Sequence, residues 1–349
     1  MIVKDEEAVL ARCLESVKGI ADEIVIVDTG STDATREIAR RFTDKVYSFE
    51  WIDDFSAARN FAFSKGTKDF LLWLDADDIL LESDRKKFLH LKETLPQDTD
   101  AVMFPYHTGF DSQGNPIFSY YRERLFRRDR GFVWKGAVHE AVEVSGKILY
   151  EEIAVTHSKL KTPDPARNLK IFEKQRQKGI EFSPREQFYY GRELYYNEKY
   201  QEAAEVLNAF LREDKGWIEN NIDACQVLSS CYERMGEKQK ALNTLFRSFA
   251  YDSPRAELCC EIGRLLMERE EYRSAIFWYE TAASRSPDLR SGGFLREDCY
   301  GYIPFLQMCV CYDRLGEYQT AHEYNRKALK LKPNDPIALS NEAYFQARI

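Results

Sequence analysis

The sequence predicts a two-part protein, in which an α/β domain built on a mainly parallel sheet is followed by an all-helical repeat domain. Its 349 residues exceed what one ordinary core covers, since domains commonly hold about 100–200 residues. Strand-length apolar runs alternate with helical patterns in the first half. After about Pro163–Pro165 the chain becomes helical and rich in Tyr, Glu, Leu and Ala. These observations place the boundary between the two parts near the middle of the chain.

The first half alternates strands and helices in the manner of a βαβ fold. The expected strands lie at 24–27, 45–49 and 70–74, and the expected helices at 31–41 and 55–64. Gly30 breaks the first of these strands, and Ser31 or Thr32 is expected to cap the helix that follows. Such a rhythm implies a parallel sheet, whose ligands bind beyond the carboxyl ends of the strands.

The second half repeats itself. Four similar blocks align on a small residue that allows two helices to approach closely, namely Ala203, Ala241, Ala275 and Ala321. Ala241 and Ala275 are 34 residues apart, which is the period of tetratricopeptide repeats, and the longer spacings indicate insertions. The segment around Phe345 is expected to cap the open end. A plain helical bundle is the alternative. We expect domains at 1–162 and 184–349, joined by a helical linker at 163–183.

Composition excludes several classes of partner. The formal net charge of -8 argues against a nucleic-acid binder, which needs a surplus of Lys and Arg. No stretch approaches the roughly 20 apolar residues of a membrane helix. The N-terminus becomes charged at Lys4, which is unlike a signal peptide, so we expect a cytoplasmic protein. None of the eight cysteines forms a CxxC pair, which favours buried, reduced thiols.

An acidic pair follows the apolar run FLLWL. Side chains alternate along a strand, so Asp75 and Asp77 point to one face, roughly 6.5–7 Å apart. Two carboxylates this close repel each other unless a cation lies near them, and oxygen ligands suit Mg²⁺ or Mn²⁺. Asp28 stands at the end of another strand. The sequence therefore indicates a metal site, with a solvated acidic turn as the alternative.

Four motifs carry a resemblance to a known family: IVIVDTGSTDAT, WIDDFSAARNFA, LLWLDADD and GAVHE. In this order they resemble family 2 glycosyltransferases, whose catalytic domain has the GT-A fold, over residues 1–160. The fusion to tetratricopeptide repeats is similar to a bacterial subgroup, some members of which glycosylate peptides, including cysteine-linked sugars on bacteriocins. The resemblance implies a nucleotide-sugar donor, expected to be a UDP-sugar, a Mn²⁺ or Mg²⁺ cofactor, and inversion by a single displacement.

The resemblance also implies roles for individual residues. Asp28 would accept a hydrogen bond from the nucleotide base, and Asp33 would orient the same loop. Arg59 would approach the nucleotide or its phosphates. Asp75 would face the ribose and metal-bound water, and Asp77 would ligate the metal directly.

Five further residues have candidate roles in catalysis, metal binding or phosphate binding. Glu140 is our candidate catalytic base, with a purely structural role as the alternative. His139 is a candidate metal ligand, substrate contact or core residue. We prefer His157 as the third metal ligand, since it follows a short strand. Arg124 and Arg127 are the candidate clamp for the diphosphate, because a guanidinium suits phosphate oxygens.

The favoured function is therefore an inverting, metal-dependent glycosyltransferase whose repeat domain holds a peptide or protein acceptor. A repeat domain can also pair with itself, so a homodimer is a possible assembly. The first alternative is an inactive scaffold that binds a peptide partner. The second is a glycosyltransferase acting on a glycan or another cell-surface acceptor. A nucleotidyltransferase ranks last, because residues 4–14 lack the glycines that cradle a triphosphate.

Overall fold

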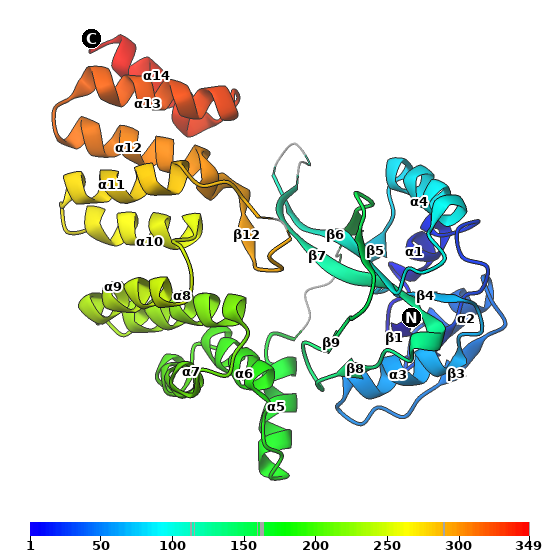
Figure 1. Cartoon of the computed structure of the whole chain (residues 1–349). Helices are drawn as coiled ribbons and strands as arrows, with labels where there is room; N and C mark the ends of the chain where they lie inside the picture. The colour runs from blue at the N-terminus through cyan, green and yellow to red at the C-terminus, as the bar shows by residue number, and fades with distance from the viewer. Residues whose placement is uncertain (112–113, 115, 159, 161–163, 289, 349) are drawn as a thin grey trace. The chain divides into compact units, whose positions relative to one another are not determined.

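The computed structural model describes residues 1–349 except 112–113, 115, 159, 161–163, 289 and 349 (Figure 1). It divides into two compact units, Met1–Glu193 and Leu194–Ile349, which we call the N-terminal unit and the repeat unit. The first is α/β and the second is helical, so the predicted fold class is confirmed. The predicted boundary at 162 and 163 lies outside the described residues, and the domain limits stay a prediction.

The N-terminal unit begins with a small parallel sheet in the order β1-β2-β3. Its elements are β1 (Ile2–Val3), α1 (Leu10–Ser16), β2 (Ile26–Asp28), α2 (Thr35–Arg40), β3 (Val46–Ser48) and α3 (Phe55–Lys65). Asp28 stands opposite Val3 and Ser48, at the carboxyl end of the sheet. The apolar residues of β1, β2 and α1 form one buried cluster beneath it. The sheet thus carries Asp28 to the edge where ligands are expected.

The second sheet is mixed, although the sequence predicted a mainly parallel one. Its strands are β4 (Phe70–Leu72), β5 (Asp78–Ile79), β6 (Ala101–Phe110), β7 (Pro116–Arg127), β10 (Ile148–Tyr150) and β11 (Val155–His157). β7 runs antiparallel to both β4 and β6, whereas β10 and β11 run parallel to β6. β11 is antiparallel to β5, and this register sets His157 opposite Asp78. Beside this sheet are α4 (Glu82–Thr94), a short ribbon of β8 (Trp134–Lys135) and β9 (Ala141–Val142), and the helix α5 (Arg167–Gln177).

Helix α2 begins at Thr35, so the prediction that Ser31 or Thr32 caps it is wrong. Those side chains and amides bond instead to the segment after β1. The Asp5 amide donates to Ser31 Oγ at 2.9 Å, and the Thr32 amide donates to Asp5 Oδ1 at 2.7 Å. Asp33 accepts from the amide of Glu7 at 3.1 Å. These contacts hold the loop 29–34 in a non-helical conformation and delay the start of the helix.

The repeat unit stacks antiparallel helix pairs, as the 34-residue spacing predicts. The helices are α6 (Pro184–Tyr196), which starts in the N-terminal unit, α7 (Tyr200–Glu213), α8 (Ile218–Arg234), α9 (Lys238–Arg247), α10 (Ala256–Met267), α11 (Tyr272–Ala283), α12 (Tyr302–Arg314), α13 (Tyr318–Leu331) and α14 (Pro336–Gln346). Ala203, Ala241, Ala275 and Ala321 are all fully buried. At Gly263 even a Cβ would approach the Tyr279 ring to 2.7 Å. Small residues therefore permit the close packing within each pair, as predicted.

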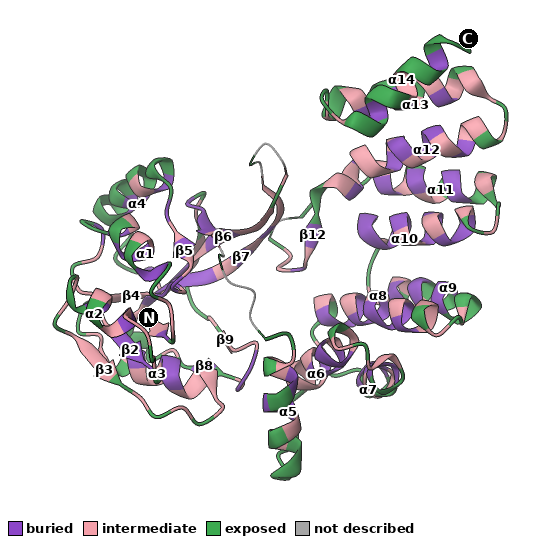
Figure 2. Cartoon of the chain, turned by 180° about the vertical axis from the view of Figure 1, so that it is seen from behind, coloured by how far each residue is buried: buried purple, intermediate pink, exposed green. Residues whose placement is uncertain are grey.

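The last helix and the thiols also agree with the sequence predictions. Phe345 of α14 is buried against Cys309 and Ala321, so this helix covers the end of the stack. All eight cysteines are buried and free. In Figure 2, helix α10 carries only buried and intermediate residues, drawn in purple and pink, whereas much of α14 is exposed and green.

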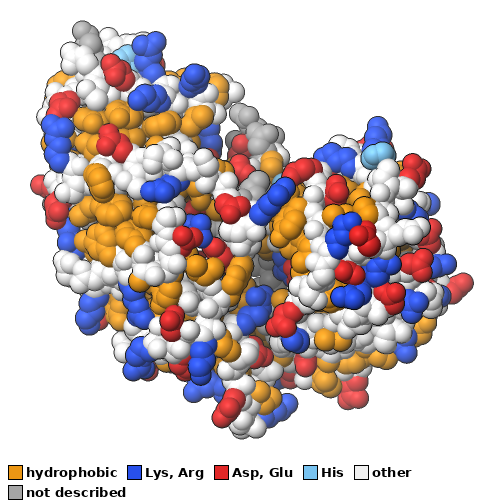
Figure 3. Space-filling model, in the orientation of Figure 1, with side chains coloured by type: hydrophobic (Ala, Val, Ile, Leu, Met, Phe, Trp, Pro, Cys, Tyr) orange, Lys and Arg blue, Asp and Glu red, His pale blue; other side chains and the backbone are white. Residues whose placement is uncertain are grey.

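The surface carries charges of both signs. On the face shown in Figure 3, basic and acidic side chains are interspersed, and apolar side chains gather over the repeat unit. Its large exposed apolar residues include Trp217, Phe246, Phe277 and Ile337. Among the described helices, none is long and apolar enough to span a bilayer.

Candidate active site

Asp28 lies at the carboxyl end of β2 and organises the turn behind it. Its side chain is buried and accepts from the amides of Gly30 at 3.3 Å and Ser31 at 3.2 Å. Gly30 adopts a φ of 104°, a conformation that side chains other than glycine's rarely tolerate. Arg36 Nη1 lies 3.8 Å from the same carboxylate. The turn is thus built around Asp28, beside the loop that Asp33 ties to Glu7.

Arg59 joins two predicted site residues from distant parts of the sequence. From helix α3 it donates through Nη2 to Asp75 Oδ1 at 2.7 Å and through Nε to Glu140 Oε1 at 2.6 Å. Its guanidinium lies over the rings of Trp73 and Trp134, at 4.8 and 4.9 Å from their centroids. Cation–π contacts with two adjacent aromatic rings and a carboxylate on two edges fix this guanidinium.

The same contact sets the charge of Asp75. Burial by itself raises the pKa of this carboxyl, but the positive charge of Arg59 and the hydrogen bond from it outweigh burial, and they lower the pKa to about 2. Asp75 is therefore an anion already paired with a cation of the protein. This pairing differs from the predicted arrangement, in which Asp75 faces a metal.

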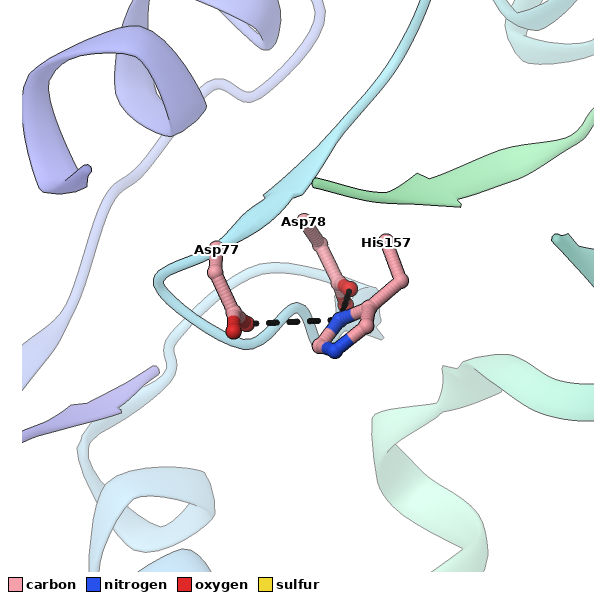
Figure 4. A group of neighbouring side chains, drawn as sticks. All are labelled: Asp77, Asp78 and His157. Atoms are coloured by element: carbon pink, nitrogen blue, oxygen red, sulfur yellow. Dashed lines mark hydrogen bonds and ion pairs between the residues drawn. The ribbon is translucent and has the colours of Figure 1, made fainter. Parts of the chain in front are cut away.

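Asp77, Asp78 and His157 form the group of side chains suited to a metal ion (Figure 4). One ligand atom from each lies within 4.8 Å of the others. His157 Nδ1 is 3.5 Å from Asp77 Oδ1 and 3.4 Å from Asp78 Oδ1. The structure thus brings the predicted ligands Asp77 and His157 together. Asp75 does not belong to this group, and its place as a metal ligand is not supported.

The pKa values in this group shift upward for different reasons. Burial, and then the repulsion by Asp75 and Asp78, raise the pKa of Asp77, while His157 opposes the shift. Burial tends to lower the pKa of His157, but the hydrogen bond to Asp78 and the charge of Asp77 outweigh it and raise the pKa. Neighbouring carboxylates contribute to both shifts, and a bound divalent cation would offset their negative charge.

Asp78 is the functional residue that sequence reasoning did not select. It is 0% exposed and each of its oxygens has a partner. Oδ2 accepts from Arg124 Nη1 at 3.0 Å and from the amide of Asp75 at 3.0 Å, and Oδ1 accepts from the Tyr106 hydroxyl at 2.9 Å. Asp78 is the third aspartate of the LLWLDADD motif, and its place in that motif was the feature of the sequence that could have identified it. Its role as an internal anchor depends on residues far along the chain.

The two arginines predicted to clamp the diphosphate do not reach this site. Arg124 is fully buried, pairs with Asp78 and lies over the rings of Trp73 and Tyr106. Arg127 stands opposite Phe70, at the start of β4, and donates from Nε to the carbonyl of Thr99 at 2.7 Å. Arg124 therefore pairs with Asp78 inside the protein. Arg127 lies opposite the first residue of β4, whereas the acidic side chains follow the last residue of that strand.

His139 is held by helix α6 rather than by the acidic group. It has a φ of 52°, stacks on Tyr189 with ring centroids 4.2 Å apart, and lies with Nε2 2.6 Å from Glu193 Oε1. Its carbonyl accepts from Arg185 at 3.2 Å. Because its partners are about 50 residues away, no local sequence pattern indicates them. The arrangement orients the adjacent Glu140.

The donor set fits a hard divalent cation. A carboxylate and an imidazole are ligands that Mn²⁺ accepts, with water completing the shell. Asp77 and His157 would hold such an ion, because the oxygens of Asp78 are already engaged. A cavity of about 970 Å³ lies elsewhere, where the strands begin, and its lining mixes apolar residues such as Phe70 and Leu91 with charged ones such as Glu23 and Arg127.

Comparison with known proteins finds a family match within each unit. Residues 1–145 match the model of glycosyl transferase family 2, and residues 256–289 and 310–335 match the tetratricopeptide repeat. A tetratricopeptide-repeat-containing protein of Synechococcus elongatus is 39% identical over 146 residues, which are 42% of this chain and 35% of that protein. The prophage-derived glycosyltransferase SunS of Bacillus subtilis is 28% identical over 244 residues, covering 65% of this chain and 56% of SunS.

A third relative differs in the pathway for which it is named. The lipopolysaccharide core biosynthesis glycosyltransferase LpsC of Rhizobium meliloti is 28% identical over 158 residues, covering 42% of this chain and 57% of that protein. The chain thus spans between 35% and 57% of the lengths of these three relatives.

Proposed function

We propose that this chain, which joins a glycosyl transferase family 2 domain to tetratricopeptide repeats, transfers a sugar from a nucleotide donor to a nucleophilic acceptor with inversion at the anomeric carbon. One observation carries the proposal. Asp28, the Arg59-linked pair of Asp75 and Glu140, and the Asp77–His157 group all lie at or near the ends of strands in the N-terminal unit. Separate groups for a nucleoside, a cation and a proton are what such a transfer requires.

The donor end of the proposed site is the turn after β2. The buried Asp28 and the loop containing Asp33 suit a nucleoside, since a carboxylate accepts from the N–H of a base. A uridine donor is our preference. Asp75, held as an anion by Arg59, is placed to accept from a ribose hydroxyl.

Asp77 and His157 would hold Mn²⁺ or Mg²⁺ beside the diphosphate. When bound, such an ion would act as a Lewis acid, and its positive charge would stabilise the leaving diphosphate. The protein's own contribution is to keep Asp77 close to His157, which the register of β5 and β11 enforces.

Glu140 is the proposed general base. Oε1 accepts from Arg59, and no side chain among the described residues bonds Oε2, which leaves this oxygen for an acceptor proton. Glu140 takes this proton as the acceptor atom attacks the anomeric carbon, the bond to the diphosphate breaks, and the nucleoside diphosphate leaves. Inversion in a single displacement requires no nucleophile from the enzyme.

We further propose that the acceptor is a peptide or protein that the repeat unit holds. Stacked helix pairs form extended surfaces suited to peptides. A glycan acceptor is the second candidate, because a relative is named for lipopolysaccharide core biosynthesis. The free, buried thiols agree with a reducing compartment, so we place the reaction in the cytoplasm. A homodimer paired through its repeats is our proposal for the assembly.

A donor panel tests this function. Purified protein is mixed with Mn²⁺ or Mg²⁺ and UDP-, GDP- or dTDP-sugars, and both the melting temperature and the release of nucleotide are recorded. We expect stabilisation by one nucleotide only when metal is present. Asp77→Asn should abolish this response, and Asp98→Asn, which alters an exposed ion pair with Lys147, should retain it. A wild-type protein that responds to no donor would favour the scaffold alternative.

A further inference from the structure

Tyr106 of strand β6 forms hydrogen bonds with both Asp78 and His157. Its side chain is buried, with the ring beneath the guanidinium of Arg124 at 4.3 Å. The hydroxyl oxygen lies 2.9 Å from Asp78 Oδ1 and 2.8 Å from His157 Nδ1. One hydroxyl therefore touches both an internal anchor and a proposed metal ligand.

The direction of these hydrogen bonds follows from what each group can donate. Asp78 faces donors on both oxygens, namely Arg124 and the amide of Asp75 on Oδ2, and the Tyr106 hydroxyl on Oδ1. Since a hydroxyl has a single proton, Tyr106 donates it to Asp78 and accepts through its oxygen. The remaining contact, with His157 Nδ1, then requires that this nitrogen carries a proton.

A neutral imidazole protonated on Nδ1 presents an unprotonated Nε2. The alternative acceptors of the Nδ1 proton are more distant, at 3.4 Å for Asp78 Oδ1 and 3.5 Å for Asp77 Oδ1. The 2.8 Å contact with Tyr106 is the shortest of the three. Figure 4 shows the second ring nitrogen of His157 directed away from Asp78.

We propose that Tyr106 is a positioning residue that fixes the Nδ1-protonated tautomer of His157, so that Nε2 ligates the metal ion while Asp78 serves as an anchor. This inference rests on the proposed function, in which Asp77 and His157 hold a divalent cation. A hydrogen bond to the second nitrogen of a ligating histidine fixes both its tautomer and its ring, and removing such a partner typically weakens metal binding 10- to 100-fold.

Tyr106→Phe tests the proposal, because it keeps the ring over Arg124 and removes only the hydroxyl. The matched control is Tyr121→Phe, which removes the hydroxyl of another buried tyrosine; that hydroxyl donates at 2.6 Å to Glu152, which lies between β10 and β11. Mn²⁺ is titrated by calorimetry into the full chain without any donor. We expect roughly a tenfold or greater loss of affinity in Tyr106→Phe and none in Tyr121→Phe.

A second readout follows the tautomer without metal. In ¹⁵N-histidine NMR at about pH 9, where imidazole is neutral, wild-type His157 should show a proton on Nδ1, and Tyr106→Phe should show a mixture. Adding ¹¹³Cd²⁺ should give coupling to Nε2. Unchanged Mn²⁺ affinity in Tyr106→Phe, a proton on Nε2, or coupling to Nδ1 would overturn the proposal. In each case donor turnover by the wild type would still support the transferase function, so the two failures are distinguishable.

Discussion

Arg59 donates to Glu140 at 2.6 Å, although 81 residues separate them in the sequence. Its second arm binds Asp75, so one guanidinium fixes the distance between a proposed nucleotide ligand and a proposed base. The adjacent rings of Trp73 and Trp134 both contact this guanidinium. Arg59 thus links the LLWLDADD motif, through Asp75, to the GAVHE motif, through Glu140, in the candidate active site.

Removing the guanidinium should therefore destabilise the fold as well as the site. We expect Arg59→Met to lower the free energy of unfolding by about 3 kcal/mol, because it leaves two carboxylates without their cation in a largely buried place. Urea denaturation measures the loss. Arg36→Met is the control, since Arg36 is itself exposed and its pair with Asp28 is 3.8 Å long, and it should cost less than about 1 kcal/mol. Equal losses would show that Arg59 has no special structural role.

Asp75 and Asp77 should separate in their effects on metal binding. Asp77→Asn is expected to weaken Mn²⁺ binding by at least about tenfold, because a ligand loses its charge. Asp75→Asn should change Mn²⁺ affinity far less, since Arg59 already engages this side chain. Calorimetry without donor measures both. A larger loss of Mn²⁺ affinity in Asp75→Asn than in Asp77→Asn would instead support the metal site predicted from the acidic pair in the sequence.

Acid should weaken the N-terminal unit through Glu23. Burial raises the pKa of this carboxyl, but hydrogen bonds from Lys45 and from both the amide and the hydroxyl of Thr67 outweigh it and lower the pKa to about 2. A carboxyl with a lowered pKa in the folded state stabilises the fold at neutral pH, and this stability is lost as the pH falls from about 4.5 to about 2.

Glu23→Gln should remove that contribution at all pH values. We expect a loss on the order of 2 kcal/mol at pH 7, reduced by the exposure of Lys45, and no difference from wild type near pH 2. Denaturation curves across this pH range measure the effect. Glu82→Gln, which alters an exposed pair with Arg85, is the control. A constant difference between Glu23→Gln and wild type at every pH would contradict the proposed titration.

The end of α6 should matter for the N-terminal unit. Tyr189 stacks on His139 and Glu193 bonds it, so both residues belong to the surroundings of Glu140. A chain ending at Asn197 is therefore expected to keep a melting temperature about 5 °C or more above that of a chain ending at Phe182. Differential scanning calorimetry of the two chains measures this. Equal melting temperatures would show that the predicted boundary at residue 183 suffices.

Local pattern was enough to predict β2, β3, β4, α3 and the repeated helix pairs, whereas α1, α4 and β6 were not predicted. The apolar run before LDADD fixes β4, and the repeated alanines fix the helix pairs. Arg124 shows where pattern fails. Arg122, Arg124 and Phe126 alternate on one face of β7, but nothing local reveals that this face points into the protein or that Asp78, 46 residues earlier, compensates the charge.

The start of α2 failed for the same reason. Ser31 and Thr32 have the chemistry of a helix cap, yet Asp5 supplies bonds to both from 26 and 27 residues upstream. Wherever the partner of a polar side chain comes from a distant segment, propensity describes only one side of the interaction. Such pairs require the tertiary structure, and several of them lie in the candidate active site.

Because every thiol is buried, the rate at which each cysteine reacts can report local opening of the protein. Cys13 lies in the N-terminal unit, and the other seven lie in the repeats, where burial raises the pKa of Cys225, Cys231 and Cys311 to about 12. A thiol reagent can attack only when a helix pair opens, so the alkylation rate of each cysteine reports the opening free energy of its own repeat. Peptide mass spectrometry of a labelling time course would rank the repeats by stability without any mutation.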